Sequence, residues 1–248
     1  MSLTYEQKKK HGYLLTAKDS RNARFIRVKT QLEKQYNRKL TRMQVRYLEK
    51  GIRKQAIYDI ETSDFNPYQN FIICCVIHVR DILTDKVDKH VFAITKKTIK
   101  EAVDATTFDF DRKLLQDVAK IFNDVDQVCG HFSDKFDNRY FTSRCLLTNQ
   151  TELIPHYQDL MAADTWRMMK KTLKAPRNTL NNLILQATGT SQKTHVDLKY
   201  WYTVKFPDNP NWQKAMDYIL DHCKKDVKMT VKAVKVIEQF NNVSGAAF

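Results

Sequence analysis

The chain has 248 residues, of which 42% are hydrophobic and 28% charged, a composition typical of a globular protein with a packed core. No apolar run reaches the roughly 18 residues of a membrane-spanning helix, and the five cysteines form no Cys-x-x-Cys pair, which argues against a disulfide framework or a zinc knuckle. We therefore expect a cytoplasmic protein with no membrane partner. The net charge of +14 favours a polyanionic partner.

The positive charge is concentrated near the N-terminus. Residues 1–55 hold 16 Lys and Arg against four Asp and Glu, whereas residues 56–248 hold 26 against 24. This asymmetry predicts a basic helical arm over 1–54 and a nearly neutral domain over 55–248. Basic segments of this kind favour contacts with nucleic-acid phosphates.

Within the arm, helical spacing predicts helices over 20–37 and 40–50. Thr41 is the expected N-cap of the second helix, with Gln44 completing a capping box. Two short basic helices with a tight connection also allow a helix-turn-helix that reads duplex DNA. The sequence favours a nonspecific phosphate clamp, or packing of the helices onto the body of the chain, over this alternative.

The remaining residues predict a sheet followed by helices. Apolar runs indicate strands over 56–60, 71–79, 88–95 and 125–129. Periodic patterns indicate helices over 98–104, 110–123, 135–147, 158–173, 178–188 and 210–240. Asn209 and Pro210 are expected to begin the last helix. The order predicts an α/β fold with helices packed on a mixed central sheet. Because only five glycines are present and none forms a Gly-rich phosphate loop, a P-loop nucleotidase is disfavoured.

Two carboxylates stand at the end of the first predicted strand. Asp59 and Glu61 are two residues apart, so an extended chain points both to one side. Such a pair repels unless a cation lies between the charges, and Mg²⁺ or Mn²⁺ favours oxygen ligands. An isolated Asp-x-Glu is also common at solvated strand ends.

Two further segments carry acids in patterned surroundings. Asp137 lies among aromatic residues after Gly130, and Asp134 competes with it for any ligand role. His222 and Asp226 are four residues apart in the last predicted helix and therefore share one face. A histidine beside acids can accept a proton from water near neutral pH.

Taken in order, these segments resemble the motifs of the DEDD superfamily of 3′–5′ exonucleases. Asp-Ile-Glu-Thr at 59–62 is similar to the first motif, the stretch 130–137 to the second, and 222–226 to the third. The resemblance covers residues 55–240 and implies a ribonuclease H-like fold. By letter, His222 corresponds to the DEDDh group, whereas the surrounding His-Cys-x-x-Asp resembles polymerase proofreading domains.

The resemblance implies a metal-dependent hydrolysis of phosphodiester bonds. It implies two ions, Mg²⁺ or Mn²⁺, held by four ligands: Asp59, Glu61, Asp137 and Asp226. His222 then orients and deprotonates the attacking water. Since 22 residues follow Asp226, we expect a free-standing exonuclease in the cytoplasm of a bacterium or of a virus-infected host cell.

The expected substrate is a single-stranded nucleic acid, with DNA favoured. Candidate substrate-binding residues are Thr62, Phe65, His131, Arg177 and Lys193. Two other functions stay open. The domain can be a non-catalytic nucleic-acid-binding module of the same fold, or the chain can be a DNA-binding regulator that uses its N-terminal helices.

Overall fold

The structure is a computed structural model that describes residues 5–10, 17–156, 159–175, 177–189, 196–240 and 246–247. The chain divides into two compact units, Met1–Ile52 and Arg53–Phe248, and each is described by itself. Within the described ranges, no helix combines the length and the apolar character that crossing a membrane requires.

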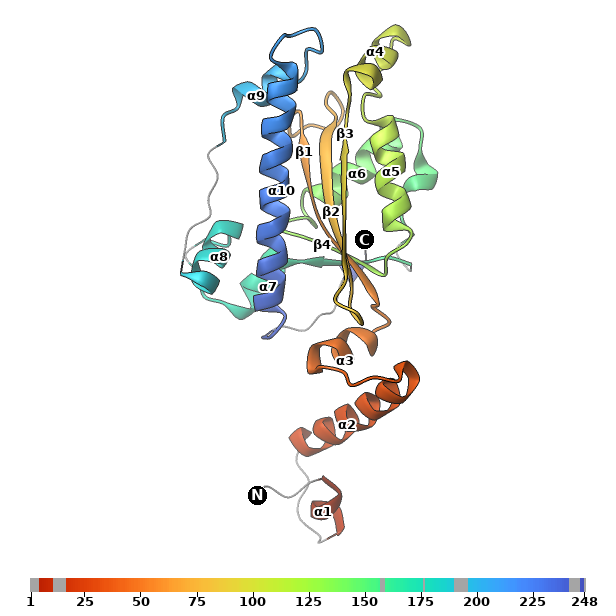
Figure 1. Cartoon of the computed structure of the whole chain (residues 1–248), viewed down its shortest axis with the longest axis vertical. Coiled ribbons are helices and arrows are strands. Elements are labelled where there is room, and N and C mark those ends of the chain that lie inside the picture. The colour runs from red at the N-terminus through yellow and green to blue at the C-terminus, as the bar shows by residue number, and fades with distance from the viewer. Residues whose placement is uncertain are drawn as a thin grey trace. The chain divides into compact units, whose positions relative to one another are not determined.

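The first unit is helical (Figure 1), with α1 over Tyr5–Lys10, α2 over Ala17–Tyr36 and α3 over Arg42–Leu48. The predicted capping box begins α3. The Thr41 side chain accepts a hydrogen bond from the Gln44 N–H at 3.2 Å, and the Gln44 side chain accepts one from the Thr41 N–H at 2.9 Å. A salt bridge of 2.9 Å between Arg24 and Glu49 joins α2 to the end of α3. Gly51 then turns the chain with a φ of 78°, which favours glycine.

The second unit is built on a central sheet. Its strands are β1 (Lys54–Thr62), β2 (Ile72–Asp81), β3 (Val87–Ala93), β4 (Gln127–Gly130), β5 (Met161–Asp164) and β6 (Ala246–Ala247). They lie in the order β3-β2-β1-β4-β5-β6. β1, β2 and β3 are antiparallel neighbours, β1, β4 and β5 run parallel, and β6 is antiparallel to β5. The predicted α/β class with a mixed sheet is confirmed, and the strand order is compatible with a ribonuclease H-like fold.

Helices cover both faces of this sheet. They are α4 (Lys96–Asp104), α5 (Arg112–Phe122), α6 (Asp137–Leu147), α7 (Thr165–Thr172), α8 (Leu180–Thr188), α9 (Lys199–Thr203) and α10 (Trp212–Ile237), with a 3₁₀ turn at Thr151–Leu153. Figure 1 shows α5 and α6 on one face of the sheet, and α10 with α7, α8 and α9 on the other. The long helix α10 contacts both β1 and β2.

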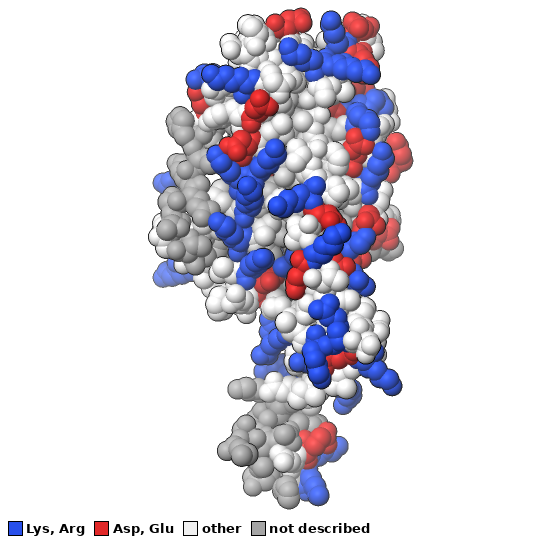
Figure 2. Space-filling model, viewed as in Figure 1, with Lys and Arg blue, Asp and Glu red and all other residues white. Residues whose placement is uncertain are grey.

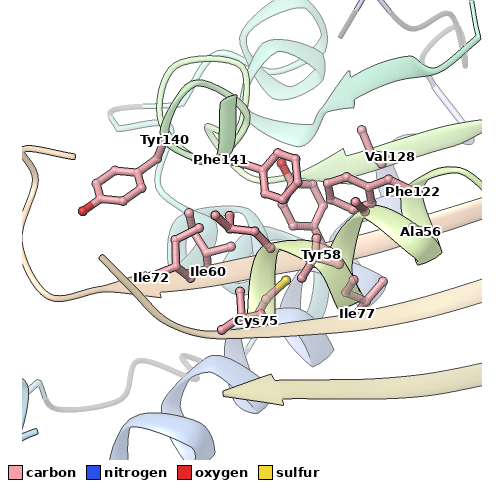
Figure 3. Close-up of a cluster of buried hydrophobic side chains, with 14 of the residues drawn as sticks. Ala56, Tyr58, Ile60, Ile72, Cys75, Ile77, Phe122, Val128, Tyr140 and Phe141 are labelled. Carbon is pink, nitrogen blue, oxygen red and sulfur yellow. The ribbon is translucent and has the colours of Figure 1, made fainter. Parts of the chain in front are cut away.

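Alternation along β1 decides which residues meet which layer of helices. Tyr58 and Ile60 point into the apolar core formed with α5 and α6, where Phe122 and Phe141 pack against them (Figure 3). Because successive side chains of a strand point to opposite faces, Asp59 belongs to the face that α10 covers. The strand pattern therefore directs a carboxylate to α10.

Two predicted helices differ from the structure. The pattern at 158–173 contains a strand followed by a helix, because Met161–Asp164 pairs with β4 as a buried strand before α7 begins at Thr165. The last helix begins at Trp212 rather than at Pro210. Asn209 instead accepts a hydrogen bond from the Asn211 N–H at 2.9 Å, which forms a turn before the helix.

A buried ion pair fixes α6 against the start of α5. The Arg144 side chain donates to both carboxylate oxygens of Asp111 at 2.9 and 2.8 Å, and to the carbonyls of Pro67 and Phe108. Asp111 also accepts a hydrogen bond from the Ile72 N–H at 2.9 Å. This bidentate geometry satisfies both charges away from water.

Replacing Arg144 by Ala should destabilise the protein by about 3–5 kcal/mol, because the Asp111 carboxylate is then buried without its partner. The free energy of unfolding is measured by urea denaturation. Arg139→Ala is the matched control, since Arg139 lies exposed on the same helix. Equal losses for both variants would contradict a special contribution from the ion pair.

Candidate metal centre and substrate pocket

Acids from β1 and α10 meet on the covered face of the sheet. His222 and Asp226 are one helical turn apart on α10, and the His222 Nε2 lies 3.6 Å from an Asp226 carboxylate oxygen. The same Nε2 lies 3.8 Å from a carboxylate oxygen of Glu61 on β1. Glu61, His222 and Asp226 thus offer three possible ligand atoms that all lie within 4.8 Å of one another.

Asp59 joins this cluster through the helix residue next to His222. The Cys223 Sγ lies 3.6 Å from a carboxylate oxygen of Asp59 and 3.4 Å from its carbonyl oxygen. Asp59, Glu61 and Cys223 also present ligand atoms within 4.8 Å of one another. The buried thiol therefore packs α10 tightly against the strand that carries both acids.

Asp137 reaches the cluster from α6. Its carboxylate accepts a hydrogen bond from the Ile60 N–H at 3.2 Å, so it sits beside β1. The neighbouring Asn138 accepts a hydrogen bond from the buried Tyr58 hydroxyl, which anchors the first turn of α6 to the same strand. Asp134, the competing acid of this segment, forms a salt bridge with Arg167 instead.

Gly130 allows the chain to turn tightly between β4 and the segment that leads to Asp137. A Cβ atom at this position would lie 2.5 Å from the Cβ of Ser133 and 3.4 Å from the Tyr58 carbonyl oxygen. The first of these distances is too short for any side chain. The glycine is thus a steric requirement of the turn that precedes α6.

Burial raises the pKa of all four carboxyls, and repulsion from neighbouring acids of the cluster adds to the shift for Asp59 and Glu61. Burial, followed by the charges of Asp137, Glu61 and Asp226, raises the pKa of Asp59 well above its usual value. Burial and the charge of Asp226 raise the pKa of Glu61 to about 8, although a hydrogen bond with Trp201 opposes the shift. Burial likewise raises the pKa of Asp137 to about 7 and raises that of Asp226.

These residues fit a hard divalent cation. Carboxylate oxygens supply the donor set that Mg²⁺ and Mn²⁺ prefer. The Oδ1 atom of Asp226 is buried without a hydrogen-bond partner. Among the described residues, no Lys or Arg forms a salt bridge with Asp59, Glu61 or Asp226. A cation would supply the missing positive charge.

Without divalent ions, the protein should lose stability as the pH rises from about 4 to about 8. The pKa values of Glu61 and Asp137 are higher in the folded state, at about 8 and about 7, than in the unfolded state. The folded state therefore binds more protons in this window, and stability falls as they leave. Thermal melting in EDTA across this range measures the effect, and added Mn²⁺ should reverse it at the upper end. A melting temperature that rises with pH in EDTA would contradict this account.

A pocket of about 440 Å³ opens beside the acids. Glu61 and His222 line it together with the predicted substrate residues Thr62 and Phe65. The Phe65 ring is 83% exposed and lies edge-on to Phe136, 6.0 Å between ring centroids. An exposed aromatic ring thus stands at the mouth of the acidic site.

The sequence interpretation missed the contribution of α9 to this pocket. The Tyr-Trp-Tyr run at 200–202 is absent from the predicted substrate-binding residues, and Tyr200 indeed stacks on Tyr218 at 4.2 Å between ring centroids. Trp201, however, packs edge-on against the His222 ring at 5.6 Å and lines the pocket with Tyr202. The aromatic run was the available signal, but its position beside His222 depends on the fold.

Other predicted substrate residues lie elsewhere. Arg177 is exposed, and its carbonyl oxygen accepts a hydrogen bond from the Asn182 side chain. His131 forms a hydrogen bond of 2.9 Å with Thr165, and burial lowers its pKa to about 4. Neither is among the described residues that line the pocket. Lys193 lies outside the described residues.

Comparisons with known proteins show a distant structural likeness. No protein-family model matches the chain, and no curated protein matches it. Among solved structures, the chain is similar to the family B DNA polymerase from the hyperthermophilic archaeon Pyrobaculum calidifontis, with 15% sequence identity and a TM-score of 0.48. The match covers 73% of this chain and 24% of the polymerase chain.

Proposed function

We propose that this protein is a metal-dependent 3′–5′ exonuclease that hydrolyses single-stranded nucleic acid, with DNA favoured. The observation that carries the proposal is the cluster of carboxylates from β1, α6 and α10, two of which lie within 4 Å of His222, next to an open pocket. Buried acids with raised pKa values and a specific charge partner in a cleft are typical of functional sites.

The carboxylates divide into two sets of cation ligands. Asp59, Glu61 and Asp226 would hold one divalent ion, while Asp59 and Asp137 would hold the other. When bound, such ions lower the pKa of water and stabilise the charge on the attacking and leaving oxygens. The chain itself supplies a rigid, partly buried frame, since β1, α6 and α10 all belong to the packed core.

His222 lies between these carboxylates and the pocket, where it can transfer a proton. Its Nε2 lies within 4 Å of carboxylate oxygens of Glu61 and Asp226, so both acids face the ring nitrogen. Trp201 packs against one side of the ring and limits its rotation. We assign His222 the role of general base toward the attacking water, while Glu61 and Asp226 hold its orientation.

The pocket supports recognition of an unpaired nucleotide. Phe65 and Tyr202 present exposed rings, at 83% and 66%, and Lys205 adds a cation to the same lining. Base-to-aromatic stacking contributes about 1–3 kcal/mol per base. A base inside a duplex cannot enter such a pocket without leaving its stack, so the geometry favours a single-stranded 3′ end.

Digestion of end-labelled oligonucleotides tests the proposal. With Mg²⁺ or Mn²⁺, a 5′-labelled single strand of DNA should shorten stepwise from its 3′ end, and EDTA should prevent this. Parallel RNA and duplex substrates establish which polymer is preferred. Intact substrates under all metal conditions, together with retained binding, would instead identify a non-catalytic nucleic-acid-binding module.

We further propose that the basic arm over residues 1–54 adds phosphate contacts. Arg21 and Arg27 are exposed on α2. For single-stranded DNA, the slope of log K against log[salt] falls in magnitude by about 0.7 for each phosphate contact that is lost. The variant Arg21→Gln/Arg27→Gln removes two such contacts, so its slope should be smaller in magnitude by about 1.4. Anisotropy titrations of a labelled oligonucleotide measure this slope. An unchanged slope would show that these arginines of the arm do not contact phosphates. Sequence-dependent binding to duplex DNA would instead favour a regulatory role.

A further inference from the structure

A second pocket lies on the other side of α10, apart from the acids. It has a volume of about 600 Å³, and residues from β2, β3 and α10 line it. Its exposed lining consists of Val87 and four lysines: Lys89, Lys225, Lys228 and Lys232. Beneath them lie the buried side chains of His78 and Met229. We call this pocket the lysine groove.

The lysine groove follows one face of α10. Lys225, Lys228 and Lys232 recur at intervals of three and four residues, so they share a face of the helix. Asp226 belongs to the face turned toward β1, and Lys232 lies six residues further along, roughly 9 Å at 1.5 Å per residue. Figure 2 shows Lys and Arg side chains gathered over α10 and toward β3. One helix thus joins the acidic cluster to a positively charged surface.

Two lysines of the groove, Lys89 and Lys228, carry positive charge close to the buried His78. Within the described part of the chain, neither Lys89 nor Lys228 forms a salt bridge. Burial, followed by the charges of these two lysines, lowers the pKa of His78. Lys225 is held by Asp221 at 2.5 Å, and both side chains are exposed. An anion placed between β3 and α10 would relieve the repulsion around Lys89 and Lys228.

We propose that the lysine groove binds the phosphodiester backbone of a single nucleic-acid strand, upstream of the 3′ end held beside Glu61. This inference rests on the proposed function for its choice of nucleic acid as the polyanion. Lysines along the exposed edge contact phosphates, while the apolar surface of Met229 and Val87 accepts a sugar or a base. A cationic groove that tracks a backbone would hold the strand between successive cleavages.

Charge neutralisation with a matched control tests this assignment. The variant Lys89→Gln/Lys228→Gln removes two groove lysines, and Lys97→Gln/Lys100→Gln removes two exposed lysines of α4. Both variants have the same net charge, so a difference between them reports the position of the charge. The probe is a 5′-labelled DNA strand of about 20 nucleotides, longer than the roughly 4–16 nucleotides that one such groove covers. Binding is followed by anisotropy in EDTA, with the melting temperature of each variant as a check of folding.

For the groove variant, we expect affinity to fall roughly tenfold or more at low salt and the salt slope to flatten by about 1.4. The α4 variant should bind like the wild type. Equal behaviour of the two variants would overturn the groove assignment. Hydrolysis of thymidine p-nitrophenyl phosphate by the wild-type protein with Mn²⁺ tests the chemistry separately, because this ester is too short to span both sites. If the ester stays intact while the two variants still differ in binding, the nuclease proposal fails and the groove stands as a nucleic-acid-binding site.

Discussion

Replacing Asp59 by Asn should lower nuclease turnover by about 10³-fold or more. This is the upper end of the loss in turnover that follows removal of a single preorganised electrostatic group from an active site. In the proposed arrangement Asp59 would contact both ions, since it shares the cluster with Glu61 and Cys223 and lies near Asp137. Single-turnover digestion of a 5′-labelled strand with saturating Mg²⁺ measures the effect. Wild-type activity in this variant would contradict the assignment.

The same substitution should raise stability in EDTA, because it removes one buried carboxylate from a set of mutually repelling acids. It should also remove most of the stabilisation by Mn²⁺, which for a tight site reaches about 2.7 kcal/mol at a ligand concentration of 100 times Kd. Asp137→Asn and Asp134→Asn form a matched pair. The first removes an acid of the cluster, whereas the second alters the partner of Arg167 and should retain both turnover and the response to Mn²⁺.

Replacing His222 by Ala should lower kcat by about 10²–10⁴-fold, the usual contribution of a general base. The affinity for a single strand should change little, since the proposed substrate contacts come from the rings of Phe65 and Tyr202 and from Lys205 in the same pocket. His90→Ala is a suitable control, because His90 stacks on Phe92 of β3, outside the pocket.

Equal losses of kcat and of affinity in His222→Ala would indicate that the ring acts by packing against Trp201 rather than by moving a proton. A second variant separates these possibilities. Trp201→Phe retains an aromatic ring beside His222 but removes the hydrogen bond with Glu61. We expect a much smaller effect on kcat from this change than from His222→Ala.

Local signals allowed several elements to be predicted. The capping box at Thr41 and Gln44 was predictable because all of its determinants lie within one turn. The strand β2 was predictable because its apolar run is covered by neighbouring elements and is buried from Ile72 to His78. The strand β5 was missed, since its four residues belong to a pattern that also suits a helix, and only pairing with β4 selects the extended form.

The sequence by itself determined the α/β class, the excess of positive charge near the N-terminus and the identity of the candidate acids. Which acids share one site was decided by tertiary structure. The contact between Asp59 and Cys223 joins residues 164 positions apart, and only the packing of α10 on β1 creates it. Asp137 rather than Asp134 faces the cluster because the turn at Gly130 and the bond between Tyr58 and Asn138 fix the start of α6. The sequence specifies which acidic side chains are present. The distances between them are set by the burial of apolar surfaces from segments that lie far apart in the chain.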